Sequence, residues 1–101
     1  MLKKSGTLKG ELKIVGGKFV KCLLKQHEGI IKEVHFNGDF FMHPEEKIEE
    51  LEQSLKNVPL KKSEVQKIIH TVLSDTELIG VSSDDFVSLL FKTYDIAEPH
   101  N

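Results

Sequence analysis

The chain has 101 residues, of which 39% are hydrophobic and 30% charged, a composition typical of one folded domain rather than of a disordered chain. The single cysteine cannot form an internal disulfide, no signal peptide is recognisable, and no apolar run approaches the roughly 20 residues that span a bilayer. We therefore expect a cytoplasmic protein without a membrane segment.

The net charge of −2 conceals an uneven distribution of charge along the chain. Residues 1–32 contain eight lysines and two glutamates, which gives +6, whereas residues 33–101 contain six lysines and fourteen acidic residues, which gives −8. All fourteen cations are lysines, so the planar guanidinium that reads guanine or phosphate is missing, and we expect no nucleic-acid partner. The basic third fits either a solvated sheet face with edge-protecting lysines, or a surface for an acidic partner or a nucleotide phosphate.

Short segments rich in β-branched and aromatic residues, punctuated by glycine, predict three strands in the first half of the chain. Thr7–Val15 is the first predicted strand, and the glycines at 16 and 17 end it. Lys18–His27 is the second. A tight hairpin at Gly29 then leads into a third strand, which covers Ile30–Phe36 or extends beyond it.

Side chains along the predicted strands alternate between two faces. Val20, Cys22 and Leu24 share one face, so we expect Cys22 to act as a small core hydrophobe rather than as a nucleophile. In the third strand Ile31 is out of phase with Val34, which indicates either a bulge or a strand that is covered on both faces.

The apolar period becomes helical after residue 43. Pro44 suits the first turn of a helix that carries Ile48, Leu51 and Leu55 and ends before Pro59.

Two further helices are predicted in the last third of the chain. Ser63 with Gln66 forms a possible capping box for the first of them, which ends near Ser74. Its apolar stripe consists of Val65, Ile68, Ile69, Val72 and Leu73. After a connection from Asp75 to Gly80, residues 81–85 supply a cap and an acidic first turn for the last helix. Its apolar residues are Phe86, Val87, Leu90, Phe91 and Tyr94.

Strands followed by helices predict an α+β fold, in which a small antiparallel sheet of about three strands from the N-terminal half packs against three helices. We expect residues 1–101 to form a single domain.

Residues that could carry chemistry are sparse. The five histidines, His27, His35, His43, His70 and His100, lack the paired spacings of zinc motifs, so no metal site is expected. His35, Asp39 and His43 could meet only if the turn after the third strand folds back. Gly16-Gly17-Lys18 lacks the full spacing and the Ser/Thr of a P-loop. It is either a glycine break between strands or a place where Lys18 contacts a carboxylate or phosphate.

The segment Asn37–Pro44 places two aromatic residues and a methionine between a strand and a helix. Phe40 and Phe41 are adjacent, and adjacent side chains on an extended segment point in opposite directions. The segment could therefore plug the core and form an interface at the same time.

Several of these motifs stand in a recognisable order along the chain. They are Gly16-Gly17-Lys18 leading into a strand, the hairpin glycine Gly29, Gly38-Asp39-Phe40-Phe41, and Pro44-Glu45-Glu46 opening an amphipathic helix. Together they resemble the C-terminal accessory domain of lipoate-protein ligases. The resemblance continues through the first helix to Ile79-Gly80-Val81-Ser82 and is strongest over residues 16–90.

The resemblance implies an α+β fold similar to the scaffold and sulfur-acceptor proteins of iron-sulfur assembly. In this family the accessory domain is either the C-terminal part of the ligase or a separate small subunit, and this chain looks like the separate form. A heterodimer with a catalytic subunit is implied, which activates lipoate to lipoyl-adenylate and then modifies a lipoyl-domain acceptor protein. Lipoate, ATP and Mg are expected in that subunit, and neither a bound cofactor nor activity is expected of this chain alone.

By position, the resemblance implies that Gly38, Asp39, Phe40 and Phe41, with Gly16, Gly17 and Lys18, form the partner interface or a cap over its active site. An alternative hypothesis is a stand-alone sulfur or iron-sulfur carrier or scaffold protein, which needs Cys22 to be exposed and activated. A third is a non-enzymatic interaction module.

Overall fold

A three-stranded antiparallel sheet and three helices make up most of the molecule. The computed structural model describes residues 5–14, 16 and 18–96. The sheet consists of β1 (Ser5–Ile14), β2 (Lys18–His27) and β3 (Ile30–Gly38), in that spatial order. The helices are α1 (Lys47–Ser54), α2 (Lys62–Val72) and α3 (Ser83–Ile96). The predicted α+β class and the three predicted strands are confirmed.

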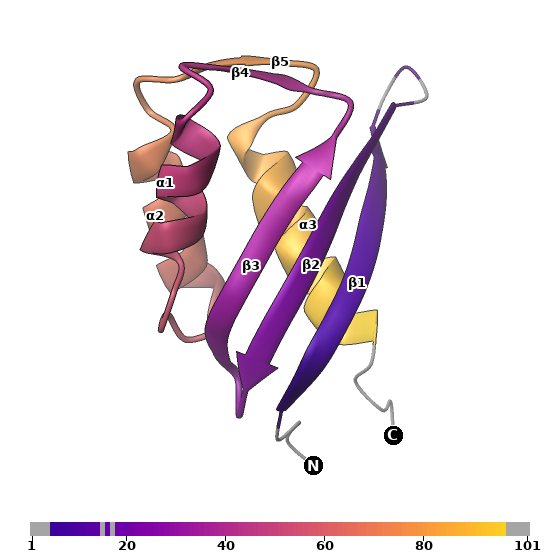
Figure 1. The fold of residues 1–101 in the computed structure, drawn as a ribbon, viewed down its shortest axis with the longest axis vertical. Helices are drawn as coiled ribbons and strands as arrows, with labels where there is room; N and C mark the ends of the chain where they lie inside the picture. The colour runs from indigo at the N-terminus through magenta and orange to yellow at the C-terminus, as the bar shows by residue number, and fades with distance from the viewer. Residues whose placement is uncertain (1–4, 15, 17, 97–101) are drawn as a thin grey trace.

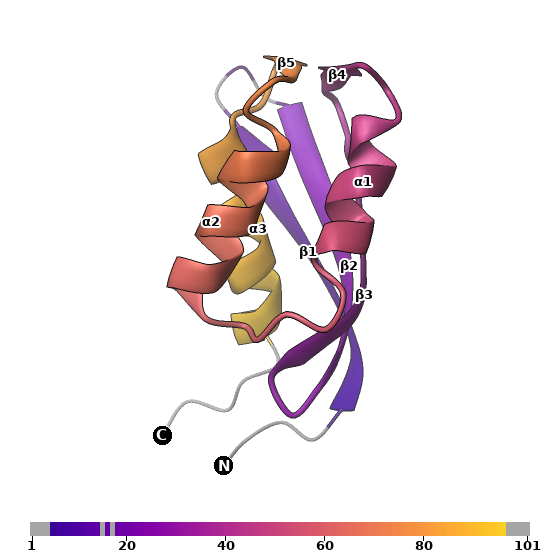
Figure 2. The same cartoon turned by 90° about the vertical axis from the view of Figure 1, so that its left-hand side faces the viewer.

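Helix α3 covers one face of the sheet, whereas α1 lies beside the edge formed by β3 (Figures 1 and 2). Helix α3 packs against β1 and β2, α1 packs against β3, and α2 contacts both other helices. The opposite face of the sheet is open, as antiparallel sheets often are. Exposed lysines at 9, 13, 21 and 25 alternate along β1 and β2 with inward-facing residues, so four of the eight lysines of the basic third lie on this open face. None of the helices in the described parts is long and apolar enough to cross a membrane.

A bulge in β3 explains why Ile31 is out of phase with Val34 in the sequence. The pairing register shifts between Lys25 and Gln26 of β2, and Lys32 of β3 is the extra residue. The bulge turns Ile31 onto the same face as Val34, and both side chains are buried. Of the two alternatives that the sequence allows, the bulge is the correct one.

The core lies between the sheet and the helices, and α3 approaches β1 closely at Gly10. A Cβ atom on Gly10 would collide with Oγ1 of Thr93. The Thr93 hydroxyl is buried and donates a hydrogen bond to the carbonyl of Leu89 at 2.8 Å. Glycine at this position therefore allows the helix to approach the sheet closely.

Two predicted helix starts are wrong. Pro44 lies in a turn before α1, in which its carbonyl accepts a hydrogen bond from the amide of Lys47 at 3.1 Å, and the helix begins at Lys47. Helix α2 begins at Lys62, its N-cap is Lys61, and no side chain caps it. Ser63 thus lies inside the first turn, too late in the chain to cap the amides that precede it.

The predicted cap of α3 is confirmed. The Ser82 hydroxyl accepts a hydrogen bond from the amide of Asp85 at 3.2 Å, and the Asp85 carboxylate accepts one from the amide of Ser82 at 2.8 Å. This reciprocal pair is a capping box, with aspartate in place of the usual glutamate.

A second, two-stranded sheet was not predicted. Strand β4 (Phe41–His43) pairs with β5 (Glu77–Ile79), which lies in the segment interpreted from the sequence as a plain connection. The two strands form a ribbon across one end of the molecule, at the top of Figure 1. Three-residue strands carry too little alternation to be recognised from sequence.

Candidate interface at the ribbon end

The two motifs implied by the resemblance meet in space. The amide of Asp39 donates a hydrogen bond to the carbonyl of Phe19 at 2.9 Å, and the amide of Phe19 donates one to the Asp39 carboxylate at 3.2 Å. Asp39 therefore ties the chain after β3 to the start of β2, directly beside Lys18. Gly16 is exposed in the turn between β1 and β2 with φ +97°, and Gly17 lies outside the described residues.

Gly38 makes this approach possible. Its φ is +148°, and a Cβ atom there would collide with the carbonyl of Phe19 and the Cα of Val20. Because both obstacles are backbone atoms of β2, no side-chain rearrangement could relieve them. A glycine in a strand often marks such a close backbone approach.

Gly80, which is distant in the sequence, lies at the same site. Its φ is +88°, and a Cβ atom there would lie 3.2 Å from the carbonyl oxygen of Asp39 and 3.9 Å from Nζ of Lys18. The exposed Lys18 ammonium therefore sits beside the junction of Gly80 and Asp39. Sequence reasoning did not assign Gly80 to the site, although it lies in the matching segment 79–82.

Phe40 and Phe41 divide the two roles that the sequence allows. The Phe40 ring meets Phe86 edge to face at 5.4 Å between centroids, and Phe36 meets the same ring at 5.0 Å. Phe41 is 71% exposed and is the cross-strand partner of Ile79, which is 53% exposed. Phe40 is thus a plug of the core, whereas Phe41 is a surface residue.

The exposed apolar side chains are concentrated at this end. Among the described residues, the large exposed apolar side chains are Phe41, Ile79 and Phe19, the last 38% exposed. A hollow of about 340 Å³ is lined by Lys18 and residues 38–41, and a second of about 270 Å³ lies on the β4–α1 side of Phe41. We call the group formed by Lys18, Asp39, Phe41 and Ile79 the Phe41 surface. Clustered exposed apolar residues with polar neighbours mark interaction sites.

Comparison with known proteins identifies the family. Residues 7–90 match the family described as bacterial lipoate protein ligase C-terminus. The chain belongs to this family. It is similar to lipoate-protein ligase A subunit 2 of Thermoplasma acidophilum, with 36% identity over 61 residues. That match covers 59% of this chain and 63% of the relative, which is less than two thirds of the relative's length.

A solved structure shows the same fold. It comes from a structural analysis of an archaeal lipoylation system, a bi-partite lipoate protein ligase and its E2 lipoyl domain from Thermoplasma acidophilum. The superposition has a TM-score of 0.73 at 26% identity and covers 83% of this chain and 93% of the other. The family resemblance seen in the sequence is therefore confirmed.

Cys22 of this ligase-family chain is in the core. Its side chain is 3% exposed, and burial raises the pKa of the thiol to about 12, although a hydrogen bond with Thr93 acts in the opposite direction. A thiol in this state supplies almost no thiolate near neutral pH. The alternative hypothesis of a sulfur carrier that uses Cys22 needs an exposed, activated cysteine, and the structure contradicts that requirement.

Three of the described histidines, His27, His35 and His70, pair with carboxylates, and His100 lies outside the described residues. His35 contacts Glu33 and Glu52, and His70 contacts Asp84 at 2.8 Å. Asp39 bonds to Phe19 rather than to a histidine. Within the described ranges, no group of three or more His, Cys, Asp or Glu side chains could hold a metal ion.

Proposed function

We propose that this chain forms one accessory domain that works in the cytoplasm beside a separate catalytic subunit of a lipoate-protein ligase. In the proposal, the catalytic subunit holds lipoate, ATP and Mg²⁺ and forms lipoyl-adenylate, and the lipoyl group then passes to a lipoyl-domain protein. This chain contributes a docking surface and no nucleophile. Family membership and the likeness to a curated ligase subunit and to a bi-partite ligase support it.

The observation that carries the proposal is the Phe41 surface. Phe41 and Ile79 lie side by side on the ribbon and expose apolar surface to water, which is unfavourable. Burial of this surface against a partner would remove the cost. Hydrogen bonds of Asp39 and the two glycines at 38 and 80 fix the ribbon end in place. A preorganised apolar surface of this kind binds without a large ordering cost.

Lys18 is assigned the polar role at this surface. Its ammonium is exposed beside Gly80, at the rim of the apolar pair. In the docked complex it contacts a carboxylate of the catalytic subunit or a phosphate of its nucleotide. Exclusion of water from the docked interface strengthens such a contact, because the local dielectric constant falls.

The deciding experiment measures the two half-reactions separately. The purified catalytic subunit is assayed for lipoate- and ATP-dependent adenylate formation with and without this chain, and for transfer from preformed lipoyl-adenylate to an acceptor domain. We expect adenylate formation to require the chain. If neither step responds and no complex forms, the proposal fails.

Variants then locate the surface. Phe41→Ser and Ile79→Ser should each weaken association by about tenfold or more, as expected for loss of a buried apolar anchor. Leu23→Ser is the matched control, because Leu23 is half-buried on the open sheet face, away from the ribbon. Lys18→Ala should slow adenylate formation while leaving most of the association intact. Equal losses in the Leu23 and Phe41 variants would contradict the assignment.

A plain interaction module remains the second candidate, because the same apolar surface would serve it. The assay separates the two. Failure of the chain to bind any catalytic subunit of a lipoate-protein ligase would favour the module.

A further inference from the structure

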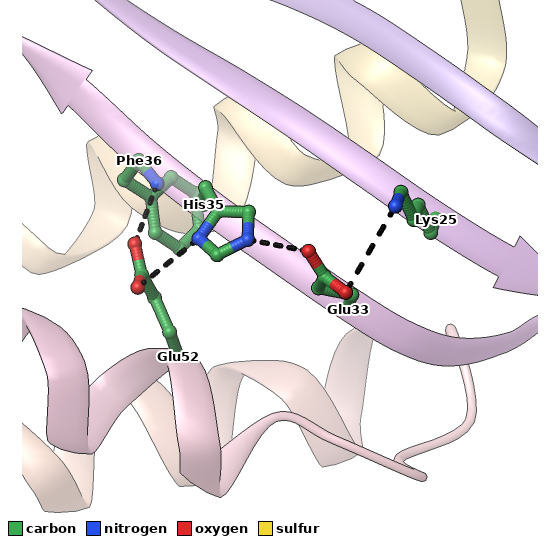
Figure 3. A network of polar contacts seen from close by, with 5 residues as sticks. All are labelled: Lys25, Glu33, His35, Phe36 and Glu52. Atoms are coloured by element: carbon green, nitrogen blue, oxygen red, sulfur yellow. Dashed lines mark hydrogen bonds and ion pairs between the residues drawn. The ribbon is translucent and has the colours of Figure 1, made fainter.

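His35 lies between two carboxylates that belong to different elements (Figure 3). Its Nε2 atom is 2.6 Å from a carboxylate oxygen of Glu33 on β3, and its Nδ1 atom is 3.4 Å from a carboxylate oxygen of Glu52 on α1. Lys25 on β2 lies 4.0 Å from Glu33. Lys56, just after α1, adds a more distant positive charge near Glu33.

This geometry favours the protonated ring. A neutral imidazole carries one N–H, so its other nitrogen would present a lone pair to a carboxylate. The imidazolium donates a hydrogen bond to Glu33 and at the same time forms an ion pair with Glu52. In keeping with this, the hydrogen bond to Glu33 and the charge of Glu52 raise the pKa of His35 above its ordinary value of 6.5.

Glu52 also reaches the backbone of the sheet. Its second carboxylate oxygen accepts a hydrogen bond from the amide of Phe36 at 2.9 Å. Strand β3 is an edge of the sheet, so this amide has no neighbouring strand on that side. The Glu52 side chain, 15% exposed, thus bridges the edge amide and the His35 ring.

The chain between Phe36 and Glu52 carries two residues of the Phe41 surface, Asp39 and Phe41. Between Phe36 and Glu52 the chain runs through Gly38, Asp39, the β4 strand with Phe41, and most of α1. The contacts of Glu52 with Phe36 and His35 join the two ends of this segment. Loss of these contacts removes one restraint on the segment that carries Phe41, and the Asp39–Phe19 hydrogen bonds and the β4–β5 pairing still hold it.

We propose that protonated His35, acting with Glu52, is a positioning device that fastens α1 to β3 and holds the Phe41 surface in its docking geometry. The proposal rests on the proposed function for what docks there. We call the contacts of Glu52 with His35 and with the Phe36 amide the fastener. Leu51 and Leu55 are fully buried and keep α1 packed without it. Its loss therefore loosens the segment without unfolding the domain.

The pH dependence has a definite sign. Because the folded-state pKa of His35 is raised, the fastener is complete below the ordinary value of 6.5 and is lost as the pH rises through the folded-state pKa. The pKa of Glu33 is lowered, mainly by its hydrogen bond to His35, so Glu33 stays ionised while His35 loses its proton.

The first test uses the isolated chain. Amide hydrogen exchange, corrected for intrinsic rates, is measured between pH 5.5 and 8.5 for Phe36 and for the β4 amides, while NMR titration follows the His35 ring. We expect protection to fall about two- to five-fold as His35 loses its proton, the range of a single exposed ion pair. In His35→Gln and Glu52→Gln the pH dependence should disappear.

His70→Gln is the matched control, because His70 pairs with Asp84 between α2 and α3, outside the fastened segment. Its protection profile should follow that of the wild type. A wild-type profile without a step, or the same step in His35→Gln, overturns the inference.

The second test uses association with the catalytic subunit over the same pH range. We expect affinity to fall as His35 deprotonates in the wild type, and to be weak and flat in His35→Gln. If the exchange step is present but no complex forms at any pH, the proposed function fails while the fastener stands. If a complex forms with the same pH profile in both proteins, the fastener does not position the docking surface.

Discussion

Gly38 shows how one residue can decide the geometry of a surface. Its positive φ and the backbone atoms of β2 beside it leave no room for a side chain. The two hydrogen bonds between Asp39 and Phe19 depend on this approach, and with them the direction in which the ribbon leaves the sheet. A matched comparison of glycines can separate backbone strain from collision.

Gly38→Ala should destabilise the chain by about 1–3 kcal/mol through strain and collision together. Gly16→Ala should cost less, because Gly16 has a positive φ but no heavy atom within 4 Å of the site of a Cβ. Urea unfolding of the isolated domain measures both. Equal losses would mean that β2 yields easily and that the close approach does not constrain the ribbon.

At the scale of the element, the start of α3 can be tested in the same way. Ser82→Ala removes the hydroxyl that accepts the Asp85 amide and should lower the free energy of unfolding by about 1 kcal/mol. Ser63→Ala is the internal control, since α2 has no side-chain cap and Ser63 lies inside its first turn. A shift in the urea midpoint for Ser82 alone is expected, and a comparable shift for Ser63 would contradict the observed caps.

Local patterns predicted the long elements well because their signals are local. Ten-residue strands with alternating side chains, and helices with several apolar turns, repeat their signal often enough to be read. The wrong capping box at Ser63 and the wrong helix start at Pro44 both concern boundaries, where one favourable residue is outweighed by the packing of buried neighbours such as Leu51 and Val65.

The β4–β5 ribbon could not be predicted from local sequence patterns. The pairing of Phe41 with Ile79 joins residues far apart in the sequence, and neither short strand has a pattern of its own. The resemblance placed Phe41 at an interface, and the exposure of that side chain agrees with the idea. Ile79 was missed as a site residue, since its exposure follows from a pairing that only the fold reveals.

At the scale of the whole molecule, the candidate interface lies far from the ends of the described chain. The molecule is 39 Å long, and the ribbon occupies one end of the long axis (Figure 1). The first residues of β1 and the last residues of α3 lie at the opposite end. The turn at Gly16, by contrast, lies beside Lys18 at the ribbon end.

This arrangement predicts how added segments will affect docking. A flexible Gly/Ser segment of about ten residues inserted after Gly16 should weaken association with the catalytic subunit, because it covers the Phe41 surface and must be displaced or ordered on binding. The same segment added before residue 1 should leave the affinity unchanged, although it adds the same mass and composition. Urea unfolding first verifies that both proteins keep the stability of the parent, and calorimetry then compares their affinities. A larger loss from the N-terminal extension than from the insertion would place the docking surface at the other end of the molecule.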